Sequence, residues 1–376
     1  MLYKIIFGIL LIIGLISLFI FNEEPLSARE KIISDSIQIK IDVEQNLQVQ
    51  KLDKFFNKRN KVNGFNGTVL FAEDGKIVYE NAFGVSNLKT KEKNNINTKF
   101  QIASVSKPFT SYAIMLLKQE GELSYEDSIQ HYFPDFPYKG ITIKLLMIHK
   151  SGLPEYFYFA ENLWEDKTKP ITNMDVVKLL SQEHPQRYYL PDKKYNYINT
   201  NYCLLAAIVE KVTGDTFEEF MAEEVFEPLE MKNTFIRNKA NDEEHENVAT
   251  GYAKRKRVAE DTYLNGVVGD KGVYTTVEDM LKFDQALYKG EPVETQTLEE
   301  AFEPAHERLY ISDNYGFGWR INASDSTNKI VYHTGWWKGF RSYFIRELGK
   351  KKTIIVLSNF SAQSIFGTKQ LIELFN

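Results

Sequence analysis

The chain has 376 residues, of which 43% are hydrophobic and 26% are charged. This composition suits a globular protein with a large core and excludes a fibrous or disordered chain. The 46 basic and 51 acidic residues give a net charge of -5, which does not fit a nucleic-acid-binding protein, because such proteins are usually basic. The one cysteine, Cys203, excludes an internal disulfide and argues against a cysteine-based metal cluster. The six histidines are scattered without an H-E-x-x-H pattern, so no metal site is predicted.

The N-terminal part of the chain carries an apolar run. Residues 5–21 contain no charge and follow Lys4. The run is longer than the apolar core of most signal peptides and slightly shorter than a full membrane span. Since no A-x-A cleavage site is evident, we expect residues 1–22 to be an uncleaved membrane anchor, with a cleaved signal segment as the alternative. We expect residues 23–45 to be a polar tether and residues 46–376 to form the main folded domain, outside the cytoplasm, because the positive charge stays inside.

A helix and a hairpin are predicted next. Apolar residues recur at helical spacing over residues 49–60, which predicts a helix. Residues 67–73 and 76–80 are rich in β-branched and aromatic residues and are joined by Asp74-Gly75. Such a pattern is typical of two strands in a tight hairpin.

A possible nucleophile follows the hairpin, in the S-x-x-K pattern of Ser104 and Lys107. Serine and lysine three residues apart on a helix share a face, and a lysine amine can serve as the base that a serine nucleophile needs. Pro108 fits only near a helix start, which places Ser104 where backbone N–H groups favour a developing anion. The pattern alone is weak, since residues 86–89 and 326–329 also match it, and a helix cap is the alternative role.

The middle of the chain, about residues 104–310, is mostly helical in pattern, and it contains Tyr197-Ile198-Asn199. A tyrosine near a lysine can act as a general base, and an asparagine can orient a carbonyl or the lysine. Taken alone, this motif indicates a polar turn that leads into a helix.

The C-terminal end is predicted to contain three strands, at residues 329–333, 341–346 and 353–358, and a closing helix from about residue 361. Strands at both ends with helices between them predict an α+β fold. One antiparallel sheet would be built from both chain ends and flanked by N- and C-terminal helices, with a mostly helical lobe inserted into it. A cleft is expected where the two lobes meet.

A third motif, His333-Thr334-Gly335, follows on the first of these strands. Glycine at this position would let a substrate backbone approach the strand edge. The N–H of Trp336 would then join that of Ser104 in an oxyanion hole. The alternative is a histidine on an ordinary strand.

In order and spacing, the three motifs resemble the S-x-x-K, Y-x-N and H/K-T-G elements of the serine β-lactamase-like superfamily, which includes class C β-lactamases, penicillin-binding DD-peptidases and related esterases. The resemblance covers about residues 50–370. It implies a β-lactamase/transpeptidase-like fold, no metal or organic cofactor, and acyl transfer on a small-molecule or peptide substrate such as a cell-wall peptide. Ser104 would form an acyl-enzyme, Lys107 and Tyr197 would move protons, and Asn199 would steady Lys107 or the substrate amide.

The sequence departs from many β-lactamases at His333, where lysine is common. Histidine is mostly neutral at neutral pH, so a peptidase or esterase is expected ahead of a β-lactamase. Thr334 and Gly335 would bind substrate, and Arg341 or Lys338 would supply the missing charge, with a surface salt bridge as the alternative. A penicillin-binding sensory module with little turnover is the remaining alternative, and the oligomeric state is left open.

Overall fold

The computed structural model describes residues 44–238, 245–307, 313–325, 327–364 and 366–376. The expected anchor, residues 1–22, and almost all of the expected tether lie outside these ranges. Within them, no helix is both long and apolar enough to cross a bilayer. The chain divides into two compact units, Met1–Lys51 and Leu52–Asn376. Residues 44–51 of the first unit are helical, and the sheet and helices below belong to the second unit.

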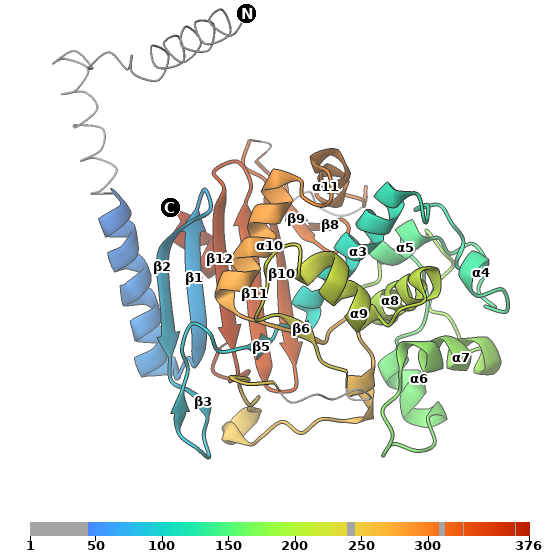
Figure 1. Ribbon diagram of the computed structural model, residues 1–376, viewed down its shortest axis with the longest axis horizontal. Coiled ribbons are helices and arrows are strands. Elements are labelled where there is room, and N and C mark those ends of the chain that lie inside the picture. The colour runs from blue at the N-terminus through green and yellow to red at the C-terminus, as the bar shows by residue number, and fades with distance from the viewer. Residues whose placement is uncertain (1–43, 239–244, 308–312, 326, 365) are drawn as a thin grey trace, which may run out of the picture. The chain divides into compact units, whose positions relative to one another are not determined.

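The second unit is built on an antiparallel sheet of seven strands in the order β2-β1-β12-β11-β10-β9-β8 (Figure 1). The N-terminal strand β1 pairs with the C-terminal strand β12, from Gly67 opposite Ser358 to Glu73 opposite Lys352. The predicted α+β fold, with one sheet made from both ends of the chain, is therefore confirmed. The strands are β1 (Gly67–Glu73), β2 (Lys76–Phe83), β8 (Asn314–Tyr315), β9 (Arg320–Asn322), β10 (Ile330–Trp337), β11 (Phe340–Glu347) and β12 (Lys352–Ser358).

The predicted hairpin between β1 and β2 turns at Asp74-Gly75. Both residues have positive φ, 48° and 74°, as a type I′ turn requires. Asparagine, aspartate and glycine tolerate this conformation best, so the local sequence determines where the sheet folds back.

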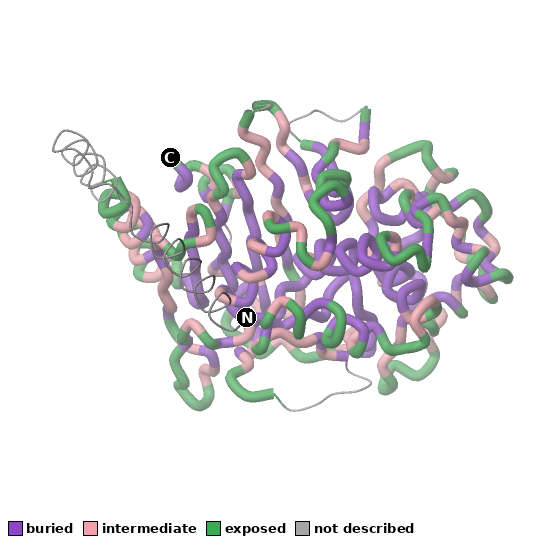
Figure 2. The backbone as a smooth tube through the Cα atoms, turned by 45° about the horizontal axis from the view of Figure 1, so that its top comes forward, coloured by how far each residue is buried: buried purple, intermediate pink, exposed green. Residues whose placement is uncertain are grey.

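The two faces of the sheet are covered by different segments. On β1, Leu70 and Ala72 join the large core shared with the helical lobe, whereas the ring of Phe71 lies 5.8 Å from that of Phe375 near the C-terminus. The alternation follows from the two-residue period of a strand. The helix α10 (Val277–Lys289) crosses the lobe-side face (Figure 1), and Figure 2 shows buried backbone running through the sheet and the central helices.

The inserted lobe is mostly helical, as predicted. A small sheet of order β5-β7-β6 lies between the lobe and the main sheet, and a hairpin of β3 and β4 completes the strands. The turn η1 (Arg59–Asn63) precedes β1 and lies outside the lobe. The helices and turns between β5 and β8 are η2 (Ala103–Val105), α3 (Ser106–Glu120), α4 (Ile129–Tyr132), α5 (Ile143–Met147), α6 (Tyr156–Leu163), α7 (Asn173–Glu183), α8 (Thr200–Thr213), α9 (Phe217–Met221), η3 (Ala222–Phe226), η5 (Lys254–Lys256), η6 (Tyr263–Gly266), α11 (Thr295–Ala301) and the helix α10 given above. The short strands are β3 (Val85–Asn87), β4 (Glu92–Lys93), β5 (Phe100–Gln101), β6 (Phe235–Ile236) and β7 (Val273–Thr275).

The closing helix begins later than predicted, at Thr368 in α12 (Thr368–Ile372) and η7 (Glu373–Phe375), instead of near residue 361. The backbone before this helix is hydrogen-bonded to a side chain of β11. The hydroxyl of Tyr343 accepts from the N–H of Phe366 at 2.9 Å and donates to the carbonyl of Ser364 at 3.2 Å. These tertiary hydrogen bonds hold the backbone at these two residues outside the helix.

Candidate active site

Ser104 lies in the short turn η2, directly before α3. The residue before it, Ala103, has a positive φ of 49°, which is uncommon for a residue with a side chain and marks local strain. Ser104 is half-buried, while its neighbours Ala103 and Val105 are buried. The turn thus brings one hydroxyl to the surface of an otherwise closed core, at the start of a long helix as expected.

Lys107 is completely buried, and its amine contacts three oxygens. Its Nζ lies 3.1 Å from Ser104 Oγ and donates to Asn199 Oδ1 at 2.8 Å and to the main-chain carbonyl of Asp270 at 3.0 Å. A neutral amine has two N–H groups and one lone pair. With both N–H groups held by the fixed amide and carbonyl oxygens, the lone pair is directed at the serine hydroxyl, which is the geometry of a general base.

The orientation of the Asn199 amide is set by Glu155, a residue that the sequence motifs did not identify. Glu155 Oε2 accepts from Asn199 N at 2.8 Å and from Asn199 Nδ2 at 3.0 Å. The amide nitrogen therefore faces the carboxylate, and the amide oxygen faces Lys107. Burial raises the pKa of the Glu155 carboxyl, and the Asn199 hydrogen bonds and the charge of Lys107 offset part of that rise.

The loop that follows η6 supplies the third oxygen, a role not predicted from the sequence. The strand β5 pairs with β7, with Gln101 opposite Tyr274, which brings the residues just before β7 against the Ser104 turn. Thr110 Oγ1 also donates to the carbonyl of Gly269 at 2.7 Å. The carbonyl of Asp270 is thereby held beside Lys107.

A second buried lysine stabilises the same loop. Lys271 Nζ donates to Tyr156 Oη at 2.6 Å, to the carbonyl of Val267 at 2.9 Å and to Asp270 Oδ1 at 3.3 Å. Tyr156 Oη in turn donates to Asp270 Oδ2 at 3.1 Å. Burial lowers the pKa of Lys271, and the Asp270 carboxylate acts against that change. A buried charge of this kind requires such partners, so the loop is fixed by one connected network.

Tyr197 lies beside Lys107, with the amine 5.0 Å from its ring centroid. The ring centroids of His149 and Tyr197 are 4.4 Å apart. His149 Nδ1 accepts from the N–H of Ile198 at 3.4 Å and lies 3.0 Å from Asn201 Nδ2. Burial lowers the pKa of His149 well below its usual value, which keeps the ring neutral. The structure thus brings three predicted residues, Ser104, Lys107 and Asn199, into hydrogen-bond contact and places the fourth, Tyr197, against them.

His333 is buried, and both of its ring nitrogens have partners. Nδ1 lies 2.9 Å from the carbonyl of Thr334 and Nε2 lies 3.2 Å from Tyr315 Oη. Burial and the nearby charge of Arg320 lower the pKa of His333 well below its usual value. A neutral ring in these contacts orders β10 and Tyr315 and carries no charge that would attract a substrate anion.

Positive charge near Tyr197 comes instead from Arg320, which the sequence analysis missed. Its guanidinium carbon lies 5.4 Å from the Tyr197 ring centroid. Arg320 lies on β9 opposite Tyr332 of β10, so only strand pairing, which the local sequence does not reveal, brings it here. Arg341 lies further along the sheet, where its Nε donates to the carbonyl of Ser361 at 3.2 Å.

Gly335 is required by the packing of the chain itself. A Cβ at this position would lie 2.1 Å from the carbonyl oxygen of Ile102 and 2.2 Å from Ser342 Oγ. The missing side chain of Gly335 thus allows the close approach of the backbone of Ile102, which lies two residues before Ser104. The contact holds the Ser104 turn against β10, next to the exposed residue Trp336.

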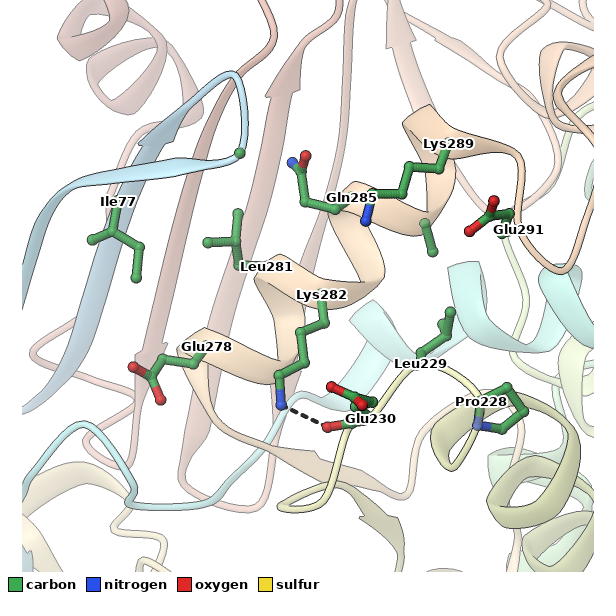
Figure 3. Close-up of a pocket in the computed structure, with 12 residues that line it drawn as sticks. Ile77, Pro228, Leu229, Glu230, Glu278, Leu281, Lys282, Gln285, Lys289 and Glu291 are labelled. Atoms are coloured by element: carbon green, nitrogen blue, oxygen red, sulfur yellow. Dashed lines mark hydrogen bonds between the residues drawn. The ribbon is translucent and has the colours of Figure 1, made fainter. Parts of the chain in front are cut away.

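A separate cavity of about 560 Å³ lies along the outer side of α10 (Figure 3). It is lined by the β1–β2 turn, by residues 228–230 and by α10, and Lys282 Nζ donates across it to the carbonyl of Glu230 at 2.6 Å. Its lining includes none of the residues of the candidate site described above. The candidate catalytic side chains of Ser104, Lys107 and Asn199 lie instead where α3, α8 and β10 meet.

The class of protein is that of the serine hydrolases. A family model described as Beta-lactamase matches residues 52–370, and the chain belongs to this family, which confirms the resemblance predicted from the three motifs. The chain is 37% identical over 323 residues to penicillin-binding protein 4* of Bacillus subtilis (strain 168), a match that covers 82% of this chain and 71% of the relative.

Solved structures share the fold. The penicillin binding protein from Bacillus halodurans superposes with a TM-score of 0.73 at 25% identity, covering 85% of this chain and 98% of its own. The D-amino acid amidase from Ochrobactrum anthropi SV3 superposes with a TM-score of 0.70 at 22% identity, covering 88% and 96%. At this identity the amidase shows likeness of fold alone.

Proposed function

We propose that the protein is an extracytoplasmic serine hydrolase that forms an acyl-enzyme on Ser104 and acts on peptides or small esters, with DD-peptidase-like activity first. The observation that carries the proposal is the Lys107 amine, 3.1 Å from Ser104 Oγ, with its two other hydrogen bonds made to oxygens that the fold holds in place. The extracytoplasmic location rests on the uncharged run at residues 5–21, which lies outside the described part of the chain.

The reaction would proceed in two acyl transfers. Ser104 Oγ bonds to the substrate carbonyl carbon as its proton passes to the neutral Lys107 amine. The carbonyl oxygen becomes an oxyanion, held by the N–H groups of Ser104 and Trp336. The proton then reaches the leaving nitrogen or oxygen through Tyr197, the bond to that atom breaks, and water repeats the sequence to release the acid and free Ser104.

The charges around the site favour a substrate with a carboxylate on its leaving half. Arg320 lies over the Tyr197 ring at 5.4 Å, while His333 is neutral because its burial lowers its pKa. A peptide that ends in a free carboxylate would place that group near Arg320 when its scissile nitrogen is near Tyr197. A small ester lacks this interaction and would react by the same route with a higher KM. The alternatives are a β-lactamase and a penicillin-binding sensory module with little turnover.

The test is covalent labelling with a fluorescent penicillin, together with hydrolysis rates for p-nitrophenyl acetate, nitrocefin and a D-Ala-D-Ala peptide. Ser104→Ala should abolish labelling and hydrolysis. Ser86→Ala is the matched control, because Ser86 belongs to a second S-x-x-K match and is buried against the carbonyl of Glu92, and it should retain both. Labelling that survives Ser104→Ala would refute the proposal. Labelling without turnover of any substrate would favour the sensory module.

A further inference from the structure

A cavity of about 730 Å³ opens at the end of β10, beside the site of the proposed reaction. Its walls come from the end of β10, the turn to β11, residues 253–264 and the segment after β12, and its principal apolar lining residues are Trp336, Trp337, Tyr263 and Leu264. Its volume lies within the range of roughly 300–1,000 Å³ that small-molecule sites occupy. Trp336 is 67% exposed, and so large an exposed ring at a cavity mouth is typical of a binding surface.

Two charged groups of the cavity lining already have hydrogen-bond partners. The carboxylate of Glu161 accepts from Tyr263 Oη at 2.8 Å and bonds Lys167. The guanidinium of Arg341 donates to the carbonyl of Ser361 at 3.2 Å. Lys254 and Lys338 also line the cavity, so the lining combines aromatic rings with charged groups.

The turn at the floor of the cavity is fixed before any ligand arrives. Lys338 and Gly339 both have positive φ, 41° and 87°, as in a tight hairpin turn. A Cβ on Gly339 would lie 2.3 Å from the N of Tyr252, so this turn is packed directly against the neighbouring loop. A preformed apolar wall loses little entropy on binding.

The position of the cavity relative to the reacting groups determines which half of a substrate reaches it. In the proposed reaction Tyr197 delivers a proton to the leaving atom, so the leaving half lies on the Tyr197 side. The oxyanion lies at the N–H of Trp336, and the side chain of the same residue lines the cavity. The acyl half, which points away from the leaving half, therefore extends over Trp336 into the cavity.

We infer that this cavity is an acyl-side subsite that takes a large apolar group, either an aromatic ring or an alkyl chain of several carbons. The inference rests on the proposed function and adds the chemical class of the acyl group. It concerns the half of the substrate that remains on Ser104 after the leaving group has departed.

The experiment compares p-nitrophenyl acetate, butyrate, hexanoate and phenylacetate, with kcat/KM of each divided by its rate with hydroxide. Complete burial of each added methylene should raise kcat/KM about fourfold. Hexanoate has four more methylenes than acetate, so even partial burial should make it exceed acetate by about tenfold or more. Phenylacetate should exceed acetate as well. A flat series would overturn the inference.

Variants locate the effect in the cavity. Ala259→Trp and, from the segment after β12, Ala362→Trp place a ring in the cavity and should bring the hexanoate-to-acetate ratio close to one. Ala222→Trp adds the same ring at an exposed position of η3 and should leave the ratio and both rates unchanged. A high ratio that persists in both cavity variants, with thermal unfolding showing that they are folded, would refute the subsite. Ester hydrolysis that survives Ser104→Ala would instead refute the proposed function, whatever the ratio.

Discussion

Replacing Glu155 by glutamine should lower kcat/KM for p-nitrophenyl acetate. The carboxylate of Glu155 is linked to the Lys107 amine through the Asn199 amide, by hydrogen bonds of 3.0 Å and 2.8 Å. With about 2.3 Å across the amide between them, the carboxylate and the amine are at most about 8 Å apart. At an effective dielectric constant of about 20, a full positive charge on the amine is attracted to the carboxylate by about 2 kcal/mol, so loss of the anion should slow acylation by up to about thirtyfold.

The direction follows from the charge that is lost. In the proposed reaction the Lys107 amine takes the Ser104 proton and becomes positive in the transition state, and Glu155→Gln removes the anion that stabilises this charge. A glutamine oxygen still accepts from Asn199, so the amide keeps its orientation. Glu155→Leu removes the acceptor too and should lower kcat/KM further. The other ionisable groups around Lys107 are unchanged in these variants: His149, Tyr197, Asp270, Lys271 and His333.

The assay is p-nitrophenyl acetate hydrolysis measured at a pH at which Glu155 is ionised. Glu165→Gln, which makes the same change of charge at an exposed position after α6, is the matched control and should leave kcat/KM unchanged, because solvent screens that charge. A kcat/KM that stays unchanged in Glu155→Gln, or rises, would refute the coupling of Glu155 to Lys107 through Asn199.

Two further predictions concern stability. Burial lowers the pKa of His306 to about 4, whereas an unfolded histidine titrates near 6.5. Between these values the unfolded state binds more protons than the folded state, so stability falls as the pH falls from about 6.5 to 4. His306→Gln should therefore make Tm less dependent on pH in this range. Arg346 and Asp284 form a buried ion pair with Nε 2.6 Å from Oδ1. Arg346→Met leaves the Asp284 carboxylate unpaired and should lower the free energy of unfolding by about 3–5 kcal/mol, or Tm by about 4–8 °C. Lys351→Met, which breaks an exposed pair with Asp74, should lower it by less than about 1 kcal/mol. Equal losses of stability in the two variants would refute the contrast.

Local signals predicted those parts of the fold that local physics determines. The Asp74-Gly75 turn is an example, because two residues that tolerate positive φ are sufficient to define it. The start of the closing helix was mispredicted by several residues, because the tertiary hydrogen bonds of Tyr343 to Ser364 and Phe366 replace those of a helix. The local sequence does not predict a hydrogen-bond partner that lies on another strand.

The candidate site shows the same division. Ser104, Lys107 and Asn199 belong to motifs and could be selected by spacing, whereas Glu155 and Arg320 belong to none of the three. Glu155 follows a Gly-Leu-Pro turn, a signal of a loop and not of a role. Arg320 reaches Tyr197 through the pairing of β9 with β10. Both matter through charge acting over several ångströms, which depends on the folded geometry and leaves no pattern in the sequence.

Burial distinguishes the S-x-x-K match of the proposed site from another match in the chain. Lys89 is exposed in the turn after β3, where water solvates its side chain and no buried acceptor fixes the direction of its amine. Lys107 has the same spacing from its serine but 0% exposure, with acceptors from residues 199 and 270, far away in the chain. The spacing sets only the distance between hydroxyl and amine. The distant acceptors determine which way the amine faces, and that is the condition for a base.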